Sequence, residues 1–74
     1  MSDEQILKDI GRKLQVIRKQ KKITQSQLSK DAEINRDHLG RIERGETNAS
    51  FEIFFCLVHC LDIKVSDFFD DDFA

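Results

Sequence analysis

The stretch TQSQLSKDAEINRDHLGRIERG, residues 24–45, decides the fold of this chain. Thr24 and Gln27 have the spacing of a capping box, in which the side chain and the backbone at a helix start bond reciprocally. A short helix is therefore expected over residues 25–32, with apolar side chains facing inward at Leu28 and Ala32. The next residues, Glu33 and Ile34, are expected to make a tight turn.

A second short helix is expected directly after that turn. Asn35 is a good N-cap, and the helix is predicted over residues 36–44, with Leu39 and Ile42 as its apolar pair. Gly45 stands where a helix C-terminal glycine belongs. Two short helices joined by a tight turn are the layout of a helix-turn-helix, here over about residues 24–44.

The rest of the chain extends this pair into an all-α fold. Apolar spacing and N-cap residues predict three further helices, over residues 3–20, 51–61 and from a Ser66 cap to about Asp71. The chain has no proline and only three glycines, which favours helices joined by short turns. The expectation is a compact five-helix bundle.

Length and composition limit what the chain can do. Its 74 residues are enough for one small domain, expected over residues 1–74, and leave no room for a substrate cleft. The longest unbroken apolar run is Ile53 to Val58, far short of the roughly 18 residues of a membrane span. The first residues lack the pattern of a signal peptide, so a cytoplasmic location is expected.

The charges are unevenly distributed along the chain. Residues 8–48 contain eleven of the twelve basic residues against six acids, whereas residues 49–74 contain one base against six acids. A small domain divided in this way has a positive face, and a positive face attracts phosphate. A simpler reading, that helical surfaces happen to be charged, stays open at this point.

The motif residues resemble the Cro/C1-type (XRE) helix-turn-helix family, whose fold is of the lambda-repressor type. The resemblance rests on Thr24-Gln25-x-x-Leu28-Ser29, on Ile34-Asn35-x-x-x-Leu39-Gly40-x-Ile42-Glu43-Arg44-Gly45, and on the apolar spacing from Asn48 to Ile63. It covers about residues 10–69. The Asn-x-Ser after Glu-Arg-Gly and the short five-helix length are most like controller proteins of restriction-modification systems.

The resemblance implies a DNA-binding transcription regulator, repressor or activator, that binds an inverted-repeat operator as a homodimer. The partner would be double-stranded DNA, without a membrane, a cofactor or an evident small-molecule ligand. The alternative is a protein-interaction module of the same fold, of the antitoxin or anti-repressor type. Enzyme activity is not expected, because the sequence shows neither a nucleophile–base pair nor a phosphate loop.

Glu33 is a departure from the family pattern within the motif itself. The turn between the two short helices usually carries glycine, and here it carries Glu33. If this residue is left-handed, the conformation costs roughly 1–2 kcal/mol. Gly40 weakens the second helix, and its expected use is to let the backbone approach the wall of the DNA groove.

The second short helix is expected to read bases in the major groove. With Leu39 and Ile42 facing the core, the opposite face carries the candidates for base contact: Arg36, Asp37, His38 and Arg41. An arginine can donate two hydrogen bonds to guanine, and an aspartate can accept one from cytosine. The competing interpretation is a solvated face with an ordinary Asp37–Arg41 pair.

Other residues are expected to hold phosphates or to support the motif. The candidates for phosphate contact are Gln25, Lys22, Arg44, Thr47 and Asn48. By resemblance, Gln25 also supports the first recognition residue. The family further implies a partly buried ion pair between Arg18 and Glu43, which would hold the recognition helix in place.

The helix over residues 51–61 is apolar on every side. Its core stripe is expected to be Phe51, Phe54, Leu57, Val58 and Leu61, which leaves apolar side chains on other faces. A two-fold dimer would cover them, with the interface expected at Ile53, Phe55, Cys56, Phe68 and Phe69. The alternative is a generous core with scattered apolar side chains on the surface.

The two cysteines, Cys56 and Cys60, are expected to be reduced small hydrophobes on one side of a helix. With His59 they would crowd three ligands onto one turn without a nearby fourth, so no metal site is expected.

Overall fold

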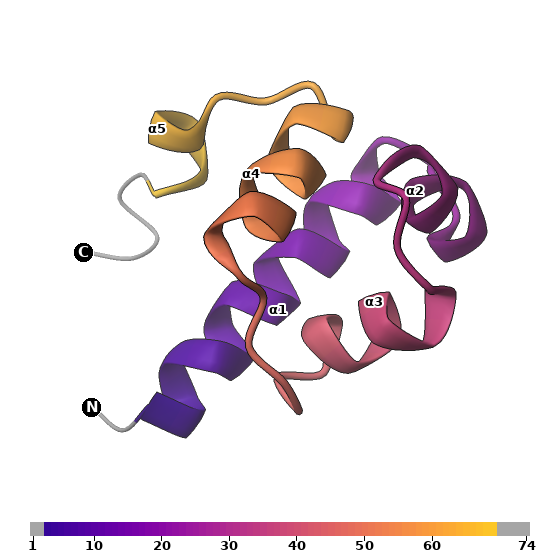
Figure 1. Ribbon diagram of the computed structural model, residues 1–74. Coiled ribbons are helices and arrows are strands. Elements are labelled where there is room, and N and C mark those ends of the chain that lie inside the picture. The colour runs from indigo at the N-terminus through magenta and orange to yellow at the C-terminus, as the bar shows by residue number, and fades with distance from the viewer. Residues whose placement is uncertain (1–2, 70–74) are drawn as a thin grey trace.

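The computed structural model describes residues 3–69, and over these residues the protein is all-α, with no strand. The five helices are α1 (Asp3–Gln20), α2 (Gln25–Asp31), α3 (Arg36–Glu43), α4 (Phe51–Cys60) and α5 (Val65–Phe68). Figure 1 shows α4 beside the long α1, with α2 and α3 toward one end of the molecule and α5 on the other side of α4. The expected five-helix bundle is confirmed.

Three of the predicted helix starts have the capping bonds that their residues suggest. The side chains of Thr24, Asn35 and Ser50 accept hydrogen bonds from the backbone N–H groups that open α2, α3 and α4, at 3.0, 2.7 and 3.2 Å. In a complete capping box the Gln27 side chain would also accept from the Thr24 backbone N–H. Here the Gln27 side chain instead donates to Asp31. Residues 2–5, Ser-Asp-Glu-Gln, also have the spacing of a capping box, but Ser2 lies outside the described residues.

The first four helices all end in the same way. A left-handed residue follows each one: Lys22 (φ 60°), Glu33 (φ 57°), Gly45 (φ 74°) and Asp62 (φ 58°). The N–H of the following residue then bonds back to a carbonyl in the last turn of the helix, as from Ile34 to Ser29 at 2.9 Å. Each turn changes the direction of the chain within a few residues. The turn at Glu33 joins α2 to α3.

The core lies where α1, α2, α3 and α4 meet. Its fully buried side chains include Leu14, Leu28, Leu39, Leu57 and Leu61. At Gly11 the backbones of α1 and α3 come very close, and a Cβ there would lie 2.7 Å from the Glu43 carbonyl oxygen. Gly11 therefore allows α3 to pack directly on α1, because glycine has no Cβ.

The structure corrects three expectations about the C-terminal part. Phe51 was expected in the core, but it lies 80% exposed at the first position of α4. Phe68 was expected at a dimer interface, but it is fully buried against Phe54, with ring centroids 5.1 Å apart. The N-cap of α5 is Lys64 rather than Ser66, and Asp71 lies outside the described residues.

Within residues 3–69, no helix combines the length and the apolar character needed to cross a membrane.

Candidate nucleic-acid interface

The outward face of α3 carries three of the four residues predicted to contact bases. Arg36, Asp37 and Arg41 are exposed, and His38 is half-buried. The opposite face is fixed by Leu39 and Ile42 in the core. Packing on the apolar face therefore determines which polar side chains α3 presents to solvent.

Asp37 and Arg41 interact one helical turn apart on this face. The Arg41 Nε lies 3.3 Å from an Asp37 carboxylate oxygen, and the side chains are 59% and 71% exposed. Such a pair stabilises a helix by only a few tenths of a kcal/mol, and water competes for both charges. Both side chains can therefore exchange this partner for a base edge at little cost.

The C-terminal end of α3 is held by a buried ion pair between Arg18 and Glu43. The Arg18 guanidinium donates to both carboxylate oxygens of Glu43, from Nε at 2.7 Å and from a terminal nitrogen at 3.1 Å. The two side chains are 8% and 1% exposed. Arg18 also donates to the Ile23 carbonyl at 2.8 Å, so one side chain connects α1, the turn before α2, and α3.

Gln25 joins the same network from the first residue of α2. Its amide nitrogen donates to Glu43 at 2.9 Å, so it supports the end of α3 rather than the first recognition residue. An amide nitrogen carries two hydrogens, so Gln25 still has a donor to offer a phosphate. The buried network thus reaches the surface at the start of α2.

Arg44, just after α3, pairs with Glu46 across the left-handed turn. The Arg44 Nε lies 2.5 Å from a carboxylate oxygen of Glu46, and both side chains are about half exposed. The hydrogen bond to Glu46 raises the pKa of Arg44, and the same bond lowers the pKa of Glu46. The sequence reasoning missed Glu46, because only the turn at Gly45 brings a residue two positions away back to Arg44.

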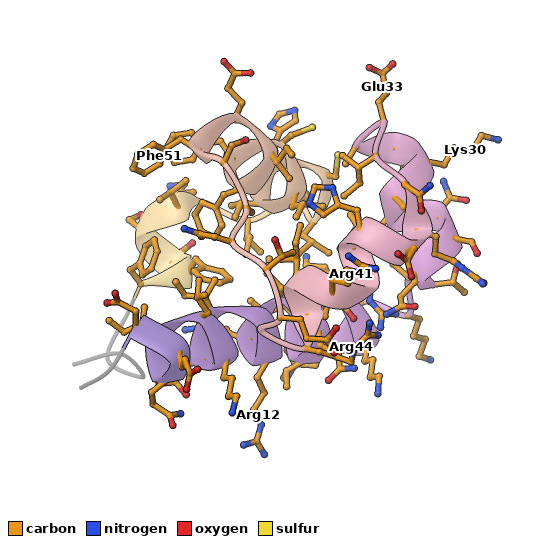
Figure 2. The ribbon with its side chains drawn as sticks, turned by 60° about the horizontal axis from the view of Figure 1, so that its bottom comes forward. Arg12, Lys30, Glu33, Arg41, Arg44 and Phe51 are labelled. Atoms are coloured by element: carbon orange, nitrogen blue, oxygen red, sulfur yellow. The ribbon has the colours of Figure 1, made fainter. Side chains whose placement is uncertain are left out.

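Gly40 was expected to leave room for the wall of the DNA groove, but its surroundings differ. It is buried beneath the Arg44 side chain, and a Cβ there would lie 3.1 Å from a terminal guanidinium nitrogen. The space that was expected to admit the groove wall is thus covered by Arg44. Figure 2 shows Arg41 and Arg44 on the same side of α3.

The remaining candidates for phosphate contact lie at the two ends of the motif. Lys22 is exposed in the left-handed turn between α1 and α2. Thr47 is half-buried and Asn48 exposed in the loop between α3 and α4. These positions flank α3 in the chain, as phosphate contacts on either side of a recognition helix would require.

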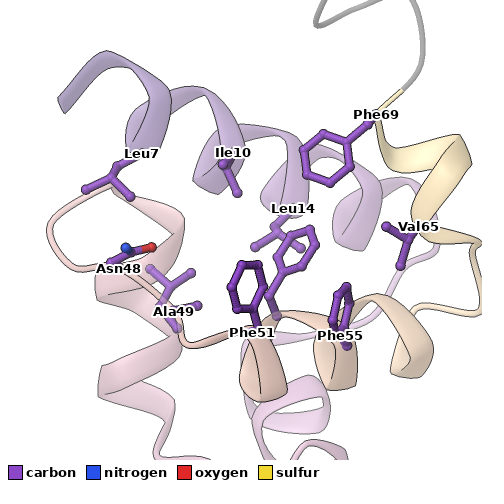
Figure 3. Close-up of a pocket in the computed structure, with 11 residues that line it drawn as sticks. Leu7, Ile10, Leu14, Asn48, Ala49, Phe51, Phe55, Val65 and Phe69 are labelled. Atoms are coloured by element: carbon purple, nitrogen blue, oxygen red, sulfur yellow. The ribbon is translucent and has the colours of Figure 1, made fainter. Parts of the chain in front are cut away.

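An apolar surface lies on another part of the molecule. It is formed by the exposed side chains of Phe51, Phe55, Val65 and Phe69, and we call it the aromatic surface. These residues surround a cavity of about 270 Å³ whose floor includes Leu14 (Figure 3). Sequence reasoning expected Phe55 and Phe69 outside the core but placed Phe51 in it, because a helix such as α4 that is apolar all round has no pattern to tell its faces apart.

The other residues expected at a dimer interface are partly covered by the protomer itself. Ile53 and Cys56 are half-buried and pack against the core. The Cys56 thiol lies 3.9 Å from the Ala32 carbonyl oxygen, which places it against the end of α2. Both cysteines are free thiols, and burial together with the neighbouring Cys56 raises the pKa of Cys60.

Comparison with known proteins gives matches of sequence and of structure. The family described as helix-turn-helix matches residues 14–68. The immunity repressor protein of Bacillus phage phi105 is 37% identical over 57 residues, which are 77% of this chain and 40% of that repressor. The crystal structure of the restriction-modification controller protein C.AhdI from Aeromonas hydrophila is 30% identical, with a TM-score of 0.81. That match covers 85% of this chain and 96% of the controller protein. The chain therefore belongs to the helix-turn-helix family of the Cro/C1 type, a family of DNA-binding regulators.

Proposed function

We propose that this chain is a sequence-specific transcription regulator, a repressor or an activator, that binds an inverted-repeat operator as a homodimer. One observation carries the proposal: α3 exposes Arg36, Asp37 and Arg41 while a buried network anchors its opposite face. A recognition helix needs both features, because its base-reading side chains must be free and its axis must be fixed.

The exposed side chains of α3 would contact the bases. Arg36 lies in the first turn, where side chains reach furthest into the major groove. Arg41 is released from Asp37 when it donates to guanine, and Asp37 can then accept from a cytosine amino group. His38 is half-buried, so we assign it a place at the edge of this contact.

Phosphate contacts would fix the position of α3 in the groove. Gln25 would donate its second amide hydrogen while the first remains on Glu43. Lys22 and Arg44 would supply charge, and Thr47 and Asn48 would supply polar contacts from the loop before α4. These contacts set affinity and orientation but carry no sequence information.

The aromatic surface would form the dimer interface. Phe51, Phe55, Val65 and Phe69 are exposed around one cavity, and a contiguous exposed apolar patch is typical of a protein contact site. Ile53 and Cys56 would lie at the margin of the same contact. To bind an inverted repeat, a dimer formed through this surface would have to hold its two recognition helices one turn of DNA apart, about 34 Å.

The similarity to a restriction-modification controller covers 85% of this chain and 96% of that protein, which supports a controller role. The proposed activity needs neither a metal nor a cofactor and no enzymatic step, and it places the chain in the cytoplasm with the DNA. The second candidate, a protein-interaction module, is favoured by the aromatic surface alone.

Selection of duplexes from a random-sequence pool, followed by fluorescence anisotropy, separates the two candidates. A regulator should enrich an inverted repeat and bind it at least about a thousandfold more tightly than a scrambled duplex. Failure to enrich any sequence, with weak binding to every duplex, would favour the interaction module.

A further inference from the structure

The Arg44–Glu46 pair lies beside the proposed DNA-contacting face of α3. The guanidinium of Arg44 crosses the outer side of the helix over Gly40, and Glu46 holds it there through Nε. A second donor of Arg44 lies 3.5 Å from the other carboxylate oxygen. Glu46 therefore meets the guanidinium with two oxygens, much as a phosphate group would.

Two further charges border this pair. Asp37 acts electrostatically on Arg44, and Arg41 acts on Glu46. Since Asp37 and Arg41 also pair with each other, the four side chains form a surface cluster with two positive and two negative charges. The four charges of this cluster thus balance one another in the free protein.

The backbone fixes Glu46 in this position. Its N–H bonds to the Arg41 carbonyl at 2.9 Å, and Gly45 takes the left-handed conformation that reverses the chain. A Cβ at Gly45 would lie 2.7 Å from the Cα of Lys8, so the turn is packed against α1. The backbone of Glu46 is therefore held by a hydrogen bond to α3 and by the packing of the turn on α1.

We propose that Glu46 competes with DNA phosphate for the guanidinium of Arg44 and so limits the affinity of the protein for DNA of any sequence. The inference rests on the proposed function. In the free protein the Arg44 charge is satisfied within the molecule, and a phosphate has to displace a carboxylate. Glu46 is a positioning residue in this account, because it acts on DNA only through Arg44.

A double-mutant cycle on a mixed-sequence duplex tests the proposal. Glu46→Gln keeps the size and the backbone bond of the residue but removes its charge. At low salt we expect it to tighten binding roughly two- to fivefold, the range typical of losing one exposed ion pair. The gain should shrink as salt is raised, because the pair is exposed and screened.

Repeating the measurement in protein that lacks Arg44 distinguishes competition for Arg44 from a general repulsion between DNA and the acidic side chain of Glu46. In Arg44→Met, or in Arg44→Gln should the first variant fold poorly, Glu46→Gln should leave affinity unchanged. An equal gain in the presence and absence of Arg44, or no gain in either, would overturn the proposal. Glu52→Gln, which removes an exposed acid from the first turn of α4, is the matched control and should change affinity little.

The two hypotheses fail in different ways in this experiment. Wild-type protein that binds no duplex at all would contradict the proposed function and this inference with it. Wild-type binding with a gain that is independent of Arg44 would contradict the inference alone. Circular dichroism on each variant checks that its helices are retained.

Discussion

Glu43 is a buried carboxylate that holds three helices through its side-chain partners. It accepts from Arg18 on α1 and from Gln25 on α2, and it lies at the last position of α3. A charge this deeply buried is tolerated only while its partners remain. The orientation of α3 therefore depends on side chains from the two helices before it, Arg18 of α1 and Gln25 of α2.

Arg18→Met should be strongly destabilising for this reason. Methionine fills much of the volume but leaves the Glu43 charge buried, which costs about 3–5 kcal/mol. Urea denaturation followed by circular dichroism measures the free energy of unfolding. Arg41→Ala, which breaks the exposed pair with Asp37, is the control and should cost about 0.5 kcal/mol or less. Equal losses for the two variants would show that the buried pair does not anchor α3.

Arg36→Ala and Arg41→Ala should each weaken specific binding by about 1–3 kcal/mol and relax base preference at one position per half-site. The reason is that both side chains are exposed on α3 and can bond guanine with two donors. Anisotropy titrations on single-base variants of the selected duplex measure this. If both variants keep wild-type affinity and preference, another face reads the bases.

Lys22→Ala should behave differently, because Lys22 is a candidate for a phosphate contact only. We expect weaker binding to all sequences alike and a salt slope reduced by about one. Titrations over a range of salt concentrations give this slope. A loss confined to the selected sequence would place Lys22 among the base-reading residues.

The individual helices were largely predictable from the sequence, because their signals are local. Thr24, Asn35 and Ser50 cap the helices that they were expected to cap, and Gly45 ends α3. The short α5 was placed less well. Its cap at Lys64 makes no side-chain bond, so no residue type marked the start of that helix.

Glu33→Gly should stabilise the protein by about 1 kcal/mol. The left-handed conformation at Glu33 is unfavourable for a side chain with a Cβ and costs nothing extra for glycine. Thermal and urea denaturation measure the gain, and Glu33→Ala, which keeps the Cβ, is the control. An equal gain in the alanine variant would assign the effect to the lost charge instead.

At the scale of the whole molecule, burial on α4 was the least predictable feature. Periodicity placed Phe54, Leu57, Val58 and Leu61 in the core, where they lie, but it also placed Phe51 there. Which face of a helix that is apolar all round is covered depends on the position of its neighbours, here α2 and α5. The burial of Phe68 has the same cause, since α5 folds back over Phe54.

In the candidate site, too, some features were predictable from the sequence and others were not. The Arg18–Glu43 pair followed from the family resemblance, and the exposed face of α3 followed from its apolar pair. The bond from Gln25 to Glu43 and the cover of Arg44 over Gly40 depend on tertiary packing, so sequence spacing gave no sign of either.

Phe55→Asp should split the proposed dimer while each protomer keeps its helices. Phe55 is 48% exposed, so the monomer core does not depend on it, whereas a carboxylate in a two-fold contact would be buried twice. Sedimentation equilibrium beside circular dichroism measures both properties. Glu52→Gln is the control, since it also changes the charge of α4, three residues before Phe55.

Two results would contradict this assignment. Wild-type protein that is monomeric at tens of micromolar would remove the need for an interface. A Phe55→Asp protein that stays dimeric would place the interface away from the aromatic surface.

Methylation interference on the selected duplex tests the central claim most directly, because methylation of guanine N7 blocks arginine contacts in the major groove. Two groups of interfering guanines are expected about one helical turn apart, one for each recognition helix. The Arg41→Ala variant should lose one guanine from each group. Uniform or absent interference, or a pattern unchanged by both Arg36→Ala and Arg41→Ala, would contradict the claim that α3 reads the sequence.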